Sequence, residues 1–398
     1  MKINVAVFFG GMSVEHEVSI ISAVQAMHSM DAEKYNILPI YITKDGIMLY
    51  GEKLNDIETY RRKSLDTLKD EFSKVIVSRN GDRVSIFEQK AGFKGRKSIA
   101  DIDIAFPIVH GTNVEDGTLA GWFELLAIPY VGCDVLSSAV GMDKAIFKDV
   151  LTSAGVPVLP YIAFFNKQWI DEQDKLIDRI ESEFGYPIII KPANLGSSVG
   201  ISKANDKKAL IEAVSLASSF STKILVERAI TSLREINCSV LGDHDGCKAS
   251  ECEEPVMTGD ILSYQDKYIN DGSASKGMQT LKRKLPADIS AEMASEIKDY
   301  ACRSFAAMGC CGVVRIDFLV DTSDNNKVYV NEANTIPGSL AFYLWEATGK
   351  KYKELLDDMI NLGFKRARNK EKLMFTYDTN ILDGVGSFGA KGSKGGKL

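Results

Sequence analysis

Apolar runs of strand length alternate with helix-like patterns along the first third of the chain. The apolar runs lie at 3–9, 35–43 and 102–111, and the helical patterns lie at 17–30 and 117–127. This alternation predicts a parallel sheet covered by helices, as in α/β proteins. Ligands bind at the loops that follow the carboxyl ends of such strands, so those loops are candidate sites.

Turn signals and shifts in composition divide the chain into three folded units and a tail. The expected domains are an N-terminal α/β unit at 1–139, a central unit at 140–230 and a third unit at 231–370. The tail at 371–398 ends in a run rich in glycine, lysine and serine, which predicts a flexible end. The charged stretch 60–74 is helix-prone and predicts a solvated insertion.

Two β-rich runs in the third unit predict an antiparallel hairpin. They occupy 312–320 and 327–334, and the residues between them are polar and turn-forming. A turn centred between Asp324 and Asn325 would pair the two runs along their length.

One face of this hairpin collects acidic and amide side chains. Residues two apart on a strand share a face, so Arg315 lies with Asp317, and Glu332 lies with Asn334. The same register places Asp317 opposite Glu332. Carboxylate and amide oxygens are hard ligands, suited to a Mg²⁺ ion that keeps some water and bridges to phosphates. A solvated polar face is the alternative for any one pair, but four such residues beside the sequence TIPG favour a metal site.

A possible phosphate-binding loop follows an apolar strand in the central unit. Lys191 ends the strand, and small residues follow it: Gly196, Ser197, Ser198 and Gly200. Glycines let backbone N–H groups approach phosphate oxygens, and the hydroxyl groups add donors. No Gly-Lys-Ser/Thr sequence closes the loop, so it is not a Walker A motif. An ordinary hairpin turn is the alternative.

Two further charged residues have both a binding and a structural interpretation. Lys144, at a helix start, is either a second cation for phosphate or a surface lysine. Glu227, at the end of an apolar strand, either accepts hydrogen bonds from an adenosine or lies in solvent. The sequence pattern alone does not decide between these interpretations.

Charge and cysteine content narrow the classes of partner and compartment. A net charge of −6 and a pI of about 5.5 argue against nucleic acid or an anionic membrane as partner. No apolar run approaches the ~20 residues that span a bilayer, and no secretory signal precedes the first strand. Seven scattered cysteines indicate reduced thiols rather than a disulfide framework. We therefore expect a cytoplasmic protein.

Taken together, these motifs carry a family resemblance over about residues 2–367. The chain resembles the D-alanine–D-alanine ligases of the ATP-grasp superfamily. The shared stretches, in chain order, are GGMSVEHEVS, HGTNVEDGTLAG, IPYVGCDVLSSAVGMDK, IIIKPANLGSSVGIS, DKY, RIDFL and NEANTIPG. The resemblance implies a three-domain ATP-grasp architecture, in which an α/β domain with a parallel sheet precedes two α+β domains that clamp ATP.

The resemblance also implies a nucleotide and metal site. The residues that would contact ATP are Lys144, Lys191, Ser198, Glu227, Glu235 and Lys267. The lysines among them would bind phosphate or close a loop over the site, and the two glutamates would hold the adenosine. The ligands of two Mg²⁺ ions, which Mn²⁺ could replace, would be Asp317, Glu332 and Asn334.

The substrate site implied by the resemblance joins all three domains. The residues that would act there are Glu15, His110, Ser197, Tyr268, Arg315 and Gly338. Glu15 would bind the ammonium group of the first D-alanine and link to Ser197 and Tyr268. Arg315 and the backbone N–H of Gly338 would stabilise the anionic intermediate. Glu17, by contrast, is explained by the preference for acidic residues in a first helical turn.

Two positions depart from the family pattern. Tyr343 and Leu344 stand where the family has the Ser–Leu pair that holds the second D-alanine, and Val114 stands where a glycine is usual. Either the phenol of Tyr343 binds the acceptor, or the pocket is reshaped for another acceptor, or Tyr343 belongs to the core.

The expected function is therefore ATP-dependent joining of two D-alanines through an acyl phosphate, by a homodimer that supplies peptidoglycan synthesis. A related ATP-grasp ligase with a different acceptor is the first alternative. A catalytically silent nucleotide-binding regulator is the second, but a complete set of metal ligands and catalytic cations argues against it. A carboxylase of the same superfamily would need a biotin partner domain, of which the sequence has no sign.

Overall fold

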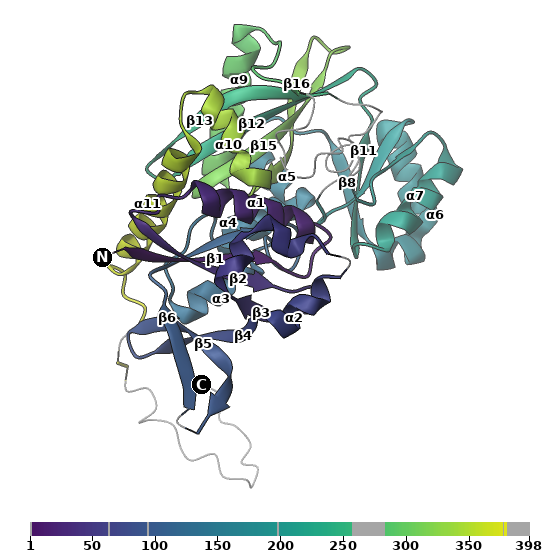
Figure 1. Cartoon of the computed structure of the whole chain (residues 1–398). Coiled ribbons are helices and arrows are strands. Elements are labelled where there is room, and N and C mark those ends of the chain that lie inside the picture. Colours follow the sequence, from purple (N-terminus) through teal and green to yellow (C-terminus); the bar gives the residue numbers. More distant parts are fainter. Residues whose placement is uncertain are drawn as a thin grey trace.

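Three sheets, each with its own helices, make up the described part of the chain (Figure 1). The structure is a computed structural model, and it describes residues 2–62, 64–93, 95–196, 199–256, 283–376 and 378–379. Four predicted site residues and the end of the predicted tail lie outside the described residues; the four are Ser197, Ser198, Lys267 and Tyr268. Within the described ranges, none of the helices is long and apolar enough to cross a membrane.

The N-terminal sheet is mixed, with strand order β6-β5-β4-β3-β2-β1-β7. Its strands are β1 (Ile3–Gly10), β2 (Tyr35–Ile42), β3 (Met48–Tyr50), β4 (Ser73–Asn80), β5 (Arg83–Gly92), β6 (Gly95–Asp101) and β7 (Ile104–Val109). The predicted parallel sheet is confirmed for β2, β1 and β7, whereas the other strands extend it in antiparallel fashion.

Both faces of β1 are covered, which explains why its sequence is apolar without interruption. Phe9 packs into a core shared with α1 (His16–Ser29) and α11 (Tyr352–Lys370) on one face. Phe8 packs on α3 (Thr118–Leu126) on the other face, with its ring centroid 5.0 Å from that of Phe123. The loops that lead into the site begin at the carboxyl ends of β1 and β7, at Gly10 and Val109.

The helical prediction for 60–74 is wrong for most of its length. Only α2 (Leu68–Glu71) is α-helical there, and short 3-10 turns precede it: η1 (Glu52–Asn55), η2 (Ile57–Tyr60) and η3 (Leu65–Thr67). Ser64 Oγ accepts a hydrogen bond from the backbone N–H of Asp66, so a side chain takes the place of the backbone carbonyl that would accept it in a helix.

The central sheet is antiparallel, with strand order β10-β9-β11-β8. Its elements are β8 (Tyr161–Phe165), α6 (Asn166–Phe184), β9 (Ile188–Pro192), β10 (Ser202–Ala204), α7 (Lys207–Ser218) and β11 (Lys223–Arg228). Ile190 and Val226 pack with the helices, so the residues that alternate with them, Lys191 and Glu227, lie on the opposite face.

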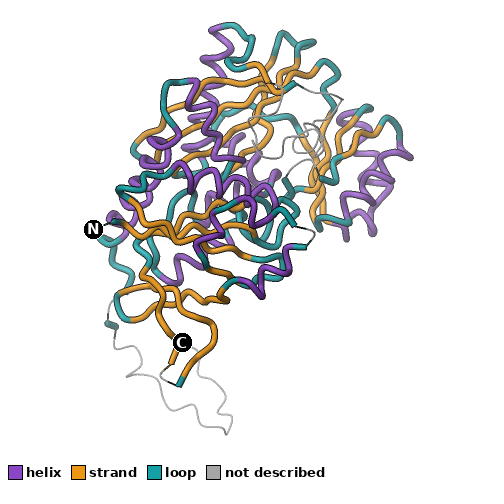
Figure 2. Tube along the Cα trace, viewed as in Figure 1, coloured by secondary structure: helices purple, strands orange, loops and turns teal. Residues whose placement is uncertain are grey.

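The third sheet has strand order β14-β13-β12-β15-β16. Figure 2 shows the strands of the molecule in orange and its helices in purple. Its elements are β12 (Leu233–Asp243), β13 (Gly246–Pro255), β14 (Arg283–Lys284), α9 (Ala291–Ala307), β15 (Gly312–Asp321) and β16 (Lys327–Asn334). The helix α5 (Lys144–Ser153), which follows α4 (Val135–Met142), packs into the core of this sheet through Phe147 and Leu151. Lys144 therefore begins a helix anchored on the third sheet.

The chain finishes by returning to the first sheet. After β16, η5 (Gly338–Ala341) and α10 (Phe342–Ala347) lead into α11, and all three contribute to the core that contains Phe9. Ser339, Leu340 and Ala341 all have φ near +50°, a left-handed turn that costs non-glycine residues energy. This strained turn fixes the direction of the backbone immediately after Gly338.

Candidate active site

The β15–β16 hairpin has the predicted residue pairing at the site, but its turn centre differs from the predicted one. Asp317 pairs with Glu332 and Arg315 with Asn334, as expected. The turn, however, is centred on Asp324, and a β-bulge at Asn331 restores the register. Without the bulge, Glu332 would follow the two-residue repeat onto the core face, because Val330 is part of the third-sheet core.

Cations neutralise the carboxylates of the hairpin. Arg315 donates two hydrogen bonds to Asp317, with N···O distances of 2.6 and 2.7 Å, and Asn334 Nδ2 donates a third at 3.0 Å. Glu332 Oε2 lies 3.4 Å from Lys144 Nζ. Lys144 is buried, so the surface alternative is wrong. Its Nζ also donates to the carbonyl of Leu195 at 2.7 Å.

This donor set fits a hard divalent cation. Asp317 and Glu332 face each other in register, and Asn334 adds an amide beside them. Oxygen ligands of this kind suit Mg²⁺, which retains water and asks for only one or two carboxylates. Among the described residues, no group of three or more His, Cys, Asp or Glu side chains is placed to hold a metal ion. The hairpin alone therefore supplies an incomplete coordination shell, of the type that phosphate oxygens complete.

Glu227 lies between two buried lysines on the open face of the central sheet. Its carboxylate oxygens lie 2.5 Å from Lys191 Nζ and 3.1 Å from Lys148 Nζ. Burial alone would raise the pKa of Glu227, but the two lysines outweigh it and lower the pKa. Lys191 also donates to Asn331 Oδ1 at 3.2 Å. Glu227 is thus buried and ionised, which excludes the solvated alternative.

Sequence reasoning did not single out Lys148. Its side chain is completely buried, and burial lowers its pKa. The signal was present, since Lys144 and Lys148 are one helical turn apart on α5 and so share a face. Two lysines on the buried side of a helix require acidic partners, which here are Glu332 and Glu227.

Glu15 lies where the N-terminal unit meets the loop of the central unit. A Cβ atom built on Gly111 or on Gly196 would stand 2.8 Å from Glu15 Oε2, so the Glu15 carboxylate would have to move to admit it. Both glycines thus leave room for the carboxylate. Gly111 follows β7, whereas Gly196 belongs to the predicted phosphate-binding loop. The predicted links from Glu15 to Ser197 and Tyr268 fall on residues outside the described part of the chain.

His110 is a neutral donor and acceptor at the carboxyl end of β7. Its Nδ1 lies 2.8 Å from the carbonyl of Ile336, which can only accept, so Nδ1 carries the proton. Nε2 then accepts from Ser22 Oγ at 2.9 Å, and Ser22 Oγ in turn accepts from the backbone N–H of Ser339. Burial lowers the pKa of His110 to about 4, so the ring stays neutral near pH 7.

Glu115 is a second residue that sequence reasoning missed. Its carboxyl group accepts from the backbone N–H groups of Gly111 and Ile336, both at 2.9 Å, and from Thr335 Oγ1 at 3.2 Å. Burial, together with the charge of Glu15, raises the pKa of Glu115 to about 8. An acidic residue in a loop has no periodic signal, so nothing in the sequence pattern distinguished it.

Some of these groups line one cavity, whereas Asp317, Lys148, Lys191 and Glu227 are not among its lining residues. The lining residues include Glu15, His110, Glu115, Lys144, Gly196, Arg315, Glu332, Asn334 and Gly338. The cavity does not include Tyr343 or Leu344. Tyr343 donates to Glu253 at 2.7 Å, with the guanidinium of Arg283 4.0 Å from the ring centroid, and Leu344 is fully buried in the core. Glu235 lies on β12, paired with Leu319 of β15.

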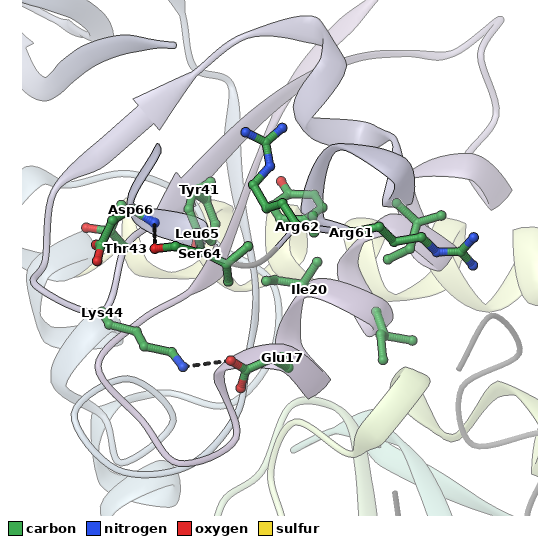
Figure 3. Close-up of a pocket in the computed structure, with 13 residues that line it drawn as sticks. Glu17, Ile20, Tyr41, Thr43, Lys44, Arg61, Arg62, Ser64, Leu65 and Asp66 are labelled. Carbon is green, nitrogen blue, oxygen red and sulfur yellow. Dashed lines mark hydrogen bonds and ion pairs between the residues drawn. The ribbon is translucent and has the colours of Figure 1, made fainter. Parts of the chain in front are cut away.

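A larger cavity of about 470 Å³ is lined by Glu17 and Ile20 of α1 and by residues that follow β2 (Figure 3). Lys44 pairs with Glu17 across it at 2.6 Å, and Tyr41, which also lines it, contacts His16 Nε2 at 2.8 Å. Its other charged groups are paired with residues outside the lining: Arg61 with Glu58, Arg62 with Glu71 and Asp66 with Lys69. The smaller cavity, with its opposed carboxylates and cations, is the candidate active site.

Three sheets around a site of buried lysines and a carboxylate-bearing hairpin define the class of an ATP-grasp enzyme. Solved structures agree with this. The D-alanine–D-alanine ligase of Coxiella burnetii is 32% identical, with a TM-score of 0.74, over 93% of this chain and 96% of that one. The VanG D-Ala:D-Ser ligase of Enterococcus faecalis is 33% identical, with a TM-score of 0.73, over 91% of this chain and 100% of that one.

The family models identify the chain more closely. The D-ala D-ala ligase N-terminus model matches residues 4–133, and the D-ala D-ala ligase C-terminus model matches residues 150–361. A D-alanine–D-alanine ligase of Caldicellulosiruptor bescii is 43% identical over 95% of this chain and 99% of its own length. The chain belongs to the D-alanine–D-alanine ligase family.

Proposed function

We propose that this chain is an ATP-dependent ligase that joins two D-alanine molecules and releases ADP and phosphate, for peptidoglycan precursor synthesis. The observation that carries the proposal is the single cavity in which Glu15, Arg315 and Glu332 meet from different parts of the chain. Full-length similarity to D-alanine–D-alanine ligases supports the same conclusion.

The chemistry begins with activation of a carboxylate. A carboxylate and an amine form a salt at neutral pH, so the first D-alanine must attack the γ-phosphate of ATP to give an acyl phosphate and ADP. Lys144 and Lys191 bind the phosphates and offset the repulsion between anions. Glu227 and Glu235, which lies on β12, hold the adenosine. Buried cations act strongly on phosphate because little water screens them.

The second step forms the amide bond. The free amine of the second D-alanine attacks the acyl carbon, and phosphate leaves. Glu15 binds the ammonium group of the first D-alanine, which fixes its carboxyl end in the cavity. Arg315 and the N–H of Gly338 donate to the oxyanion of the tetrahedral intermediate. His110, which is neutral, positions Ser22 and the turn after Gly338.

Asp317, Glu332 and Asn334 would hold Mg²⁺, or Mn²⁺ in its place. A divalent ion there supplies charge stabilisation for phosphoryl transfer. Arg315 keeps Asp317 oriented through two hydrogen bonds, and Lys144 keeps Glu332 beside the phosphate-binding loop.

The test is ADP and phosphate release with D-alanine, ATP and Mg²⁺. We expect release to require all three and to fall by about a hundredfold or more in Glu332→Gln, which removes several kcal/mol of charge stabilisation. Glu346→Gln, an exposed glutamate on α10, is the matched control and should remain active. Near-normal turnover of Glu332→Gln would refute the metal assignment, and no D-alanine-dependent release would refute the proposed activity.

A different acceptor is the second candidate. Tyr343 and Leu344 replace the Ser–Leu pair, and one of the similar structures is a D-Ala:D-Ser ligase. Mass spectrometry of products formed from D-alanine with equal amounts of D-alanine, D-serine and D-lactate separates the two candidates.

We further propose a cytoplasmic homodimer. ATP is available in the cytoplasm, and all seven cysteines of the chain are free thiols, as that compartment maintains them. The contact surface we propose lies on α3 and α4, where Leu125 and Leu136 are 87% and 68% exposed. Neither nucleic acid nor membrane is an expected partner of a chain with net charge −6.

A further inference from the structure

The Gly338 N–H, one of the two proposed oxyanion donors, belongs to the peptide group that joins Pro337 to Gly338, and Gly338 lines the cavity. The carbonyl of this peptide group accepts from the backbone N–H of Leu340 at 2.7 Å. Because the N–H and C=O of a trans peptide point in opposite directions, this hydrogen bond also sets the direction of the Gly338 N–H. Leu340 lies in the left-handed turn, so the turn aims the donor.

The left-handed turn needs support from outside its own residues. Ser339, Leu340 and Ala341 have φ of 50°, 54° and 50°, and none of them is glycine. A left-handed conformation is disfavoured for any residue that has a Cβ atom, so three in succession persist only where neighbouring groups enforce them. The supporting groups come from α1, in the N-terminal unit.

Two side chains of α1 hold Ser339. Ser22 Oγ accepts from the Ser339 N–H at 2.9 Å, and Gln25 Oε1 accepts from Ser339 Oγ at 2.6 Å. Ser22 and Ser339 are each 1% exposed, so solvent does not replace either partner. Leu340 belongs to the same buried core as Ile20 of α1. Polar and apolar groups of one helix therefore support the turn together.

The Ser22 hydroxyl also fixes the residue before Pro337. It donates to His110 Nε2 at 2.9 Å, and His110 Nδ1 donates to the carbonyl of Ile336 at 2.8 Å. Ser22 uses its single hydrogen in this contact, because the Ser339 N–H can only donate to it. The relay from Ser339 through Ser22 and His110 thus ends at Ile336, and it spans the donor peptide from both sides.

We propose that Ser22 is a positioning residue for the second step of the reaction, because it holds the left-handed turn so that the Gly338 N–H points at the oxyanion of the tetrahedral intermediate. This inference rests on the proposed function, which supplies the oxyanion. Without the Ser22 hydroxyl, the buried Ser339 N–H loses its acceptor. The turn then relaxes toward the right-handed conformation that L-residues favour, and the donor peptide rotates with it.

The test measures both steps of the reaction in Ser22→Ala. Steady-state formation of D-alanyl-D-alanine reports the whole reaction, whereas positional isotope exchange within ATP reports formation and reversal of the acyl phosphate. Removing an oxyanion donor costs about a hundredfold or more in kcat, and displacing one costs less, so we expect kcat to fall about ten- to a hundredfold. The ratio of exchange to dipeptide formation should rise by a similar factor, because the acyl phosphate persists longer and reverts more often. The KM for ATP should change by less than about threefold.

Ser29→Ala makes the same substitution on the same helix and is the matched control. Ser29 Oγ donates to the carbonyl of Gln25 within α1, so this variant should keep the wild-type kcat and exchange ratio. Gln25→Ala removes the second contact to Ser339 and should show the pattern of Ser22→Ala to a smaller degree.

A wild-type kcat in Ser22→Ala would overturn the inference. An equal fall of exchange and of dipeptide formation would also overturn it, because that pattern places the defect before the second step. If Ser22→Ala does not fold, Gln25→Ala decides the matter by the same two criteria. A wild-type protein that forms no D-alanyl-D-alanine from ATP and D-alanine would instead overturn the proposed function, and this inference with it.

Discussion

A single buried lysine supports the nucleotide-binding face without lining the cavity. Lys148 is fully buried beside Glu227, and no hydrogen-bond partner within the described residues meets its Nζ in suitable geometry, although the two charges lie 3.1 Å apart. Its contribution is therefore the charge itself, which lets Glu227 remain ionised and, in the proposed function, frees Lys191 to bind a phosphate.

Replacing Lys148 by methionine should leave Glu227 short of one positive charge. Breaking a buried ion pair in this way costs about 3–5 kcal/mol, so we expect a loss of that size in the free energy of unfolding and weaker ATP binding. Urea denaturation and equilibrium ATP titration measure the two effects. Lys167→Met, an exposed lysine on α6, should change neither quantity. Wild-type behaviour of Lys148→Met would contradict the assigned role.

The structure favours a core role for Tyr343. Its hydroxyl is committed to Glu253, which also accepts from Arg283 and Asn237. Tyr343→Phe should therefore cost about 1.5–3 kcal/mol of stability, the value of a hydrogen bond to a charged group. The acceptor KM should change by less than about threefold. Steady-state kinetics with varied acceptor provides the check, and a KM increase of tenfold or more would show that the phenol binds the acceptor.

At the scale of the element, the bulge accommodates the extra residue Asn331 and so keeps Glu332 on the polar face. Deleting Asn331 should restore a regular ladder in which Glu332 directly follows Val330 and still lies opposite Asp317. We therefore expect the deletion variant to retain Mg²⁺-dependent phosphate release, as should Asn331→Ala, which keeps the extra residue and removes only the contact with Lys191. Loss of release in the deletion variant but not in Asn331→Ala would contradict this account of the bulge.

The same hairpin shows what the sequence could predict. Its turn residues and β-rich runs identified two antiparallel strands, and the two-residue repeat placed Arg315 with Asp317. Residue alternation carries no signal for a bulge. The sequence therefore predicted the pairing of Asp317 with Glu332 from a turn centred between Asp324 and Asn325, whereas the turn is centred on Asp324 and the bulge makes up the difference. The antiparallel strands β4 to β6 escaped prediction because their apolar stretches are short and lie among polar, exposed residues.

The cavity was predictable where chemistry and spacing coincide, as at Glu332 and Asn334. Lys148 and Glu115 were not singled out, because their importance depends on burial, which only tertiary packing determines. The helix expected at 60–74 failed for a local reason, since side-chain hydrogen bonds at Ser64 compete with helical ones.

At the scale of the whole molecule, exposed leucines on α3 and α4 predict self-association. Wild-type protein at micromolar concentration should have the mass of a dimer by light scattering, and Leu125→Glu with Leu136→Glu should yield a monomer, because two buried charges cannot be accommodated in an apolar contact. Phe93→Glu changes an equally exposed apolar residue at a distant hairpin tip and should remain dimeric. A monomeric wild-type protein would refute the proposed dimer contact on α3 and α4.

The return of the chain to its first sheet sets an order of events during synthesis. The core around Phe9 contains Leu355 and Met359 of α11 as well as residues of α1, so the cover that α1 gives to the earliest strands is completed only when α11 has been made. The central sheet, by contrast, draws its whole core from 162–226 and can close early. A nascent chain therefore carries a partly exposed apolar face through most of its translation, the kind of surface that chaperones bind.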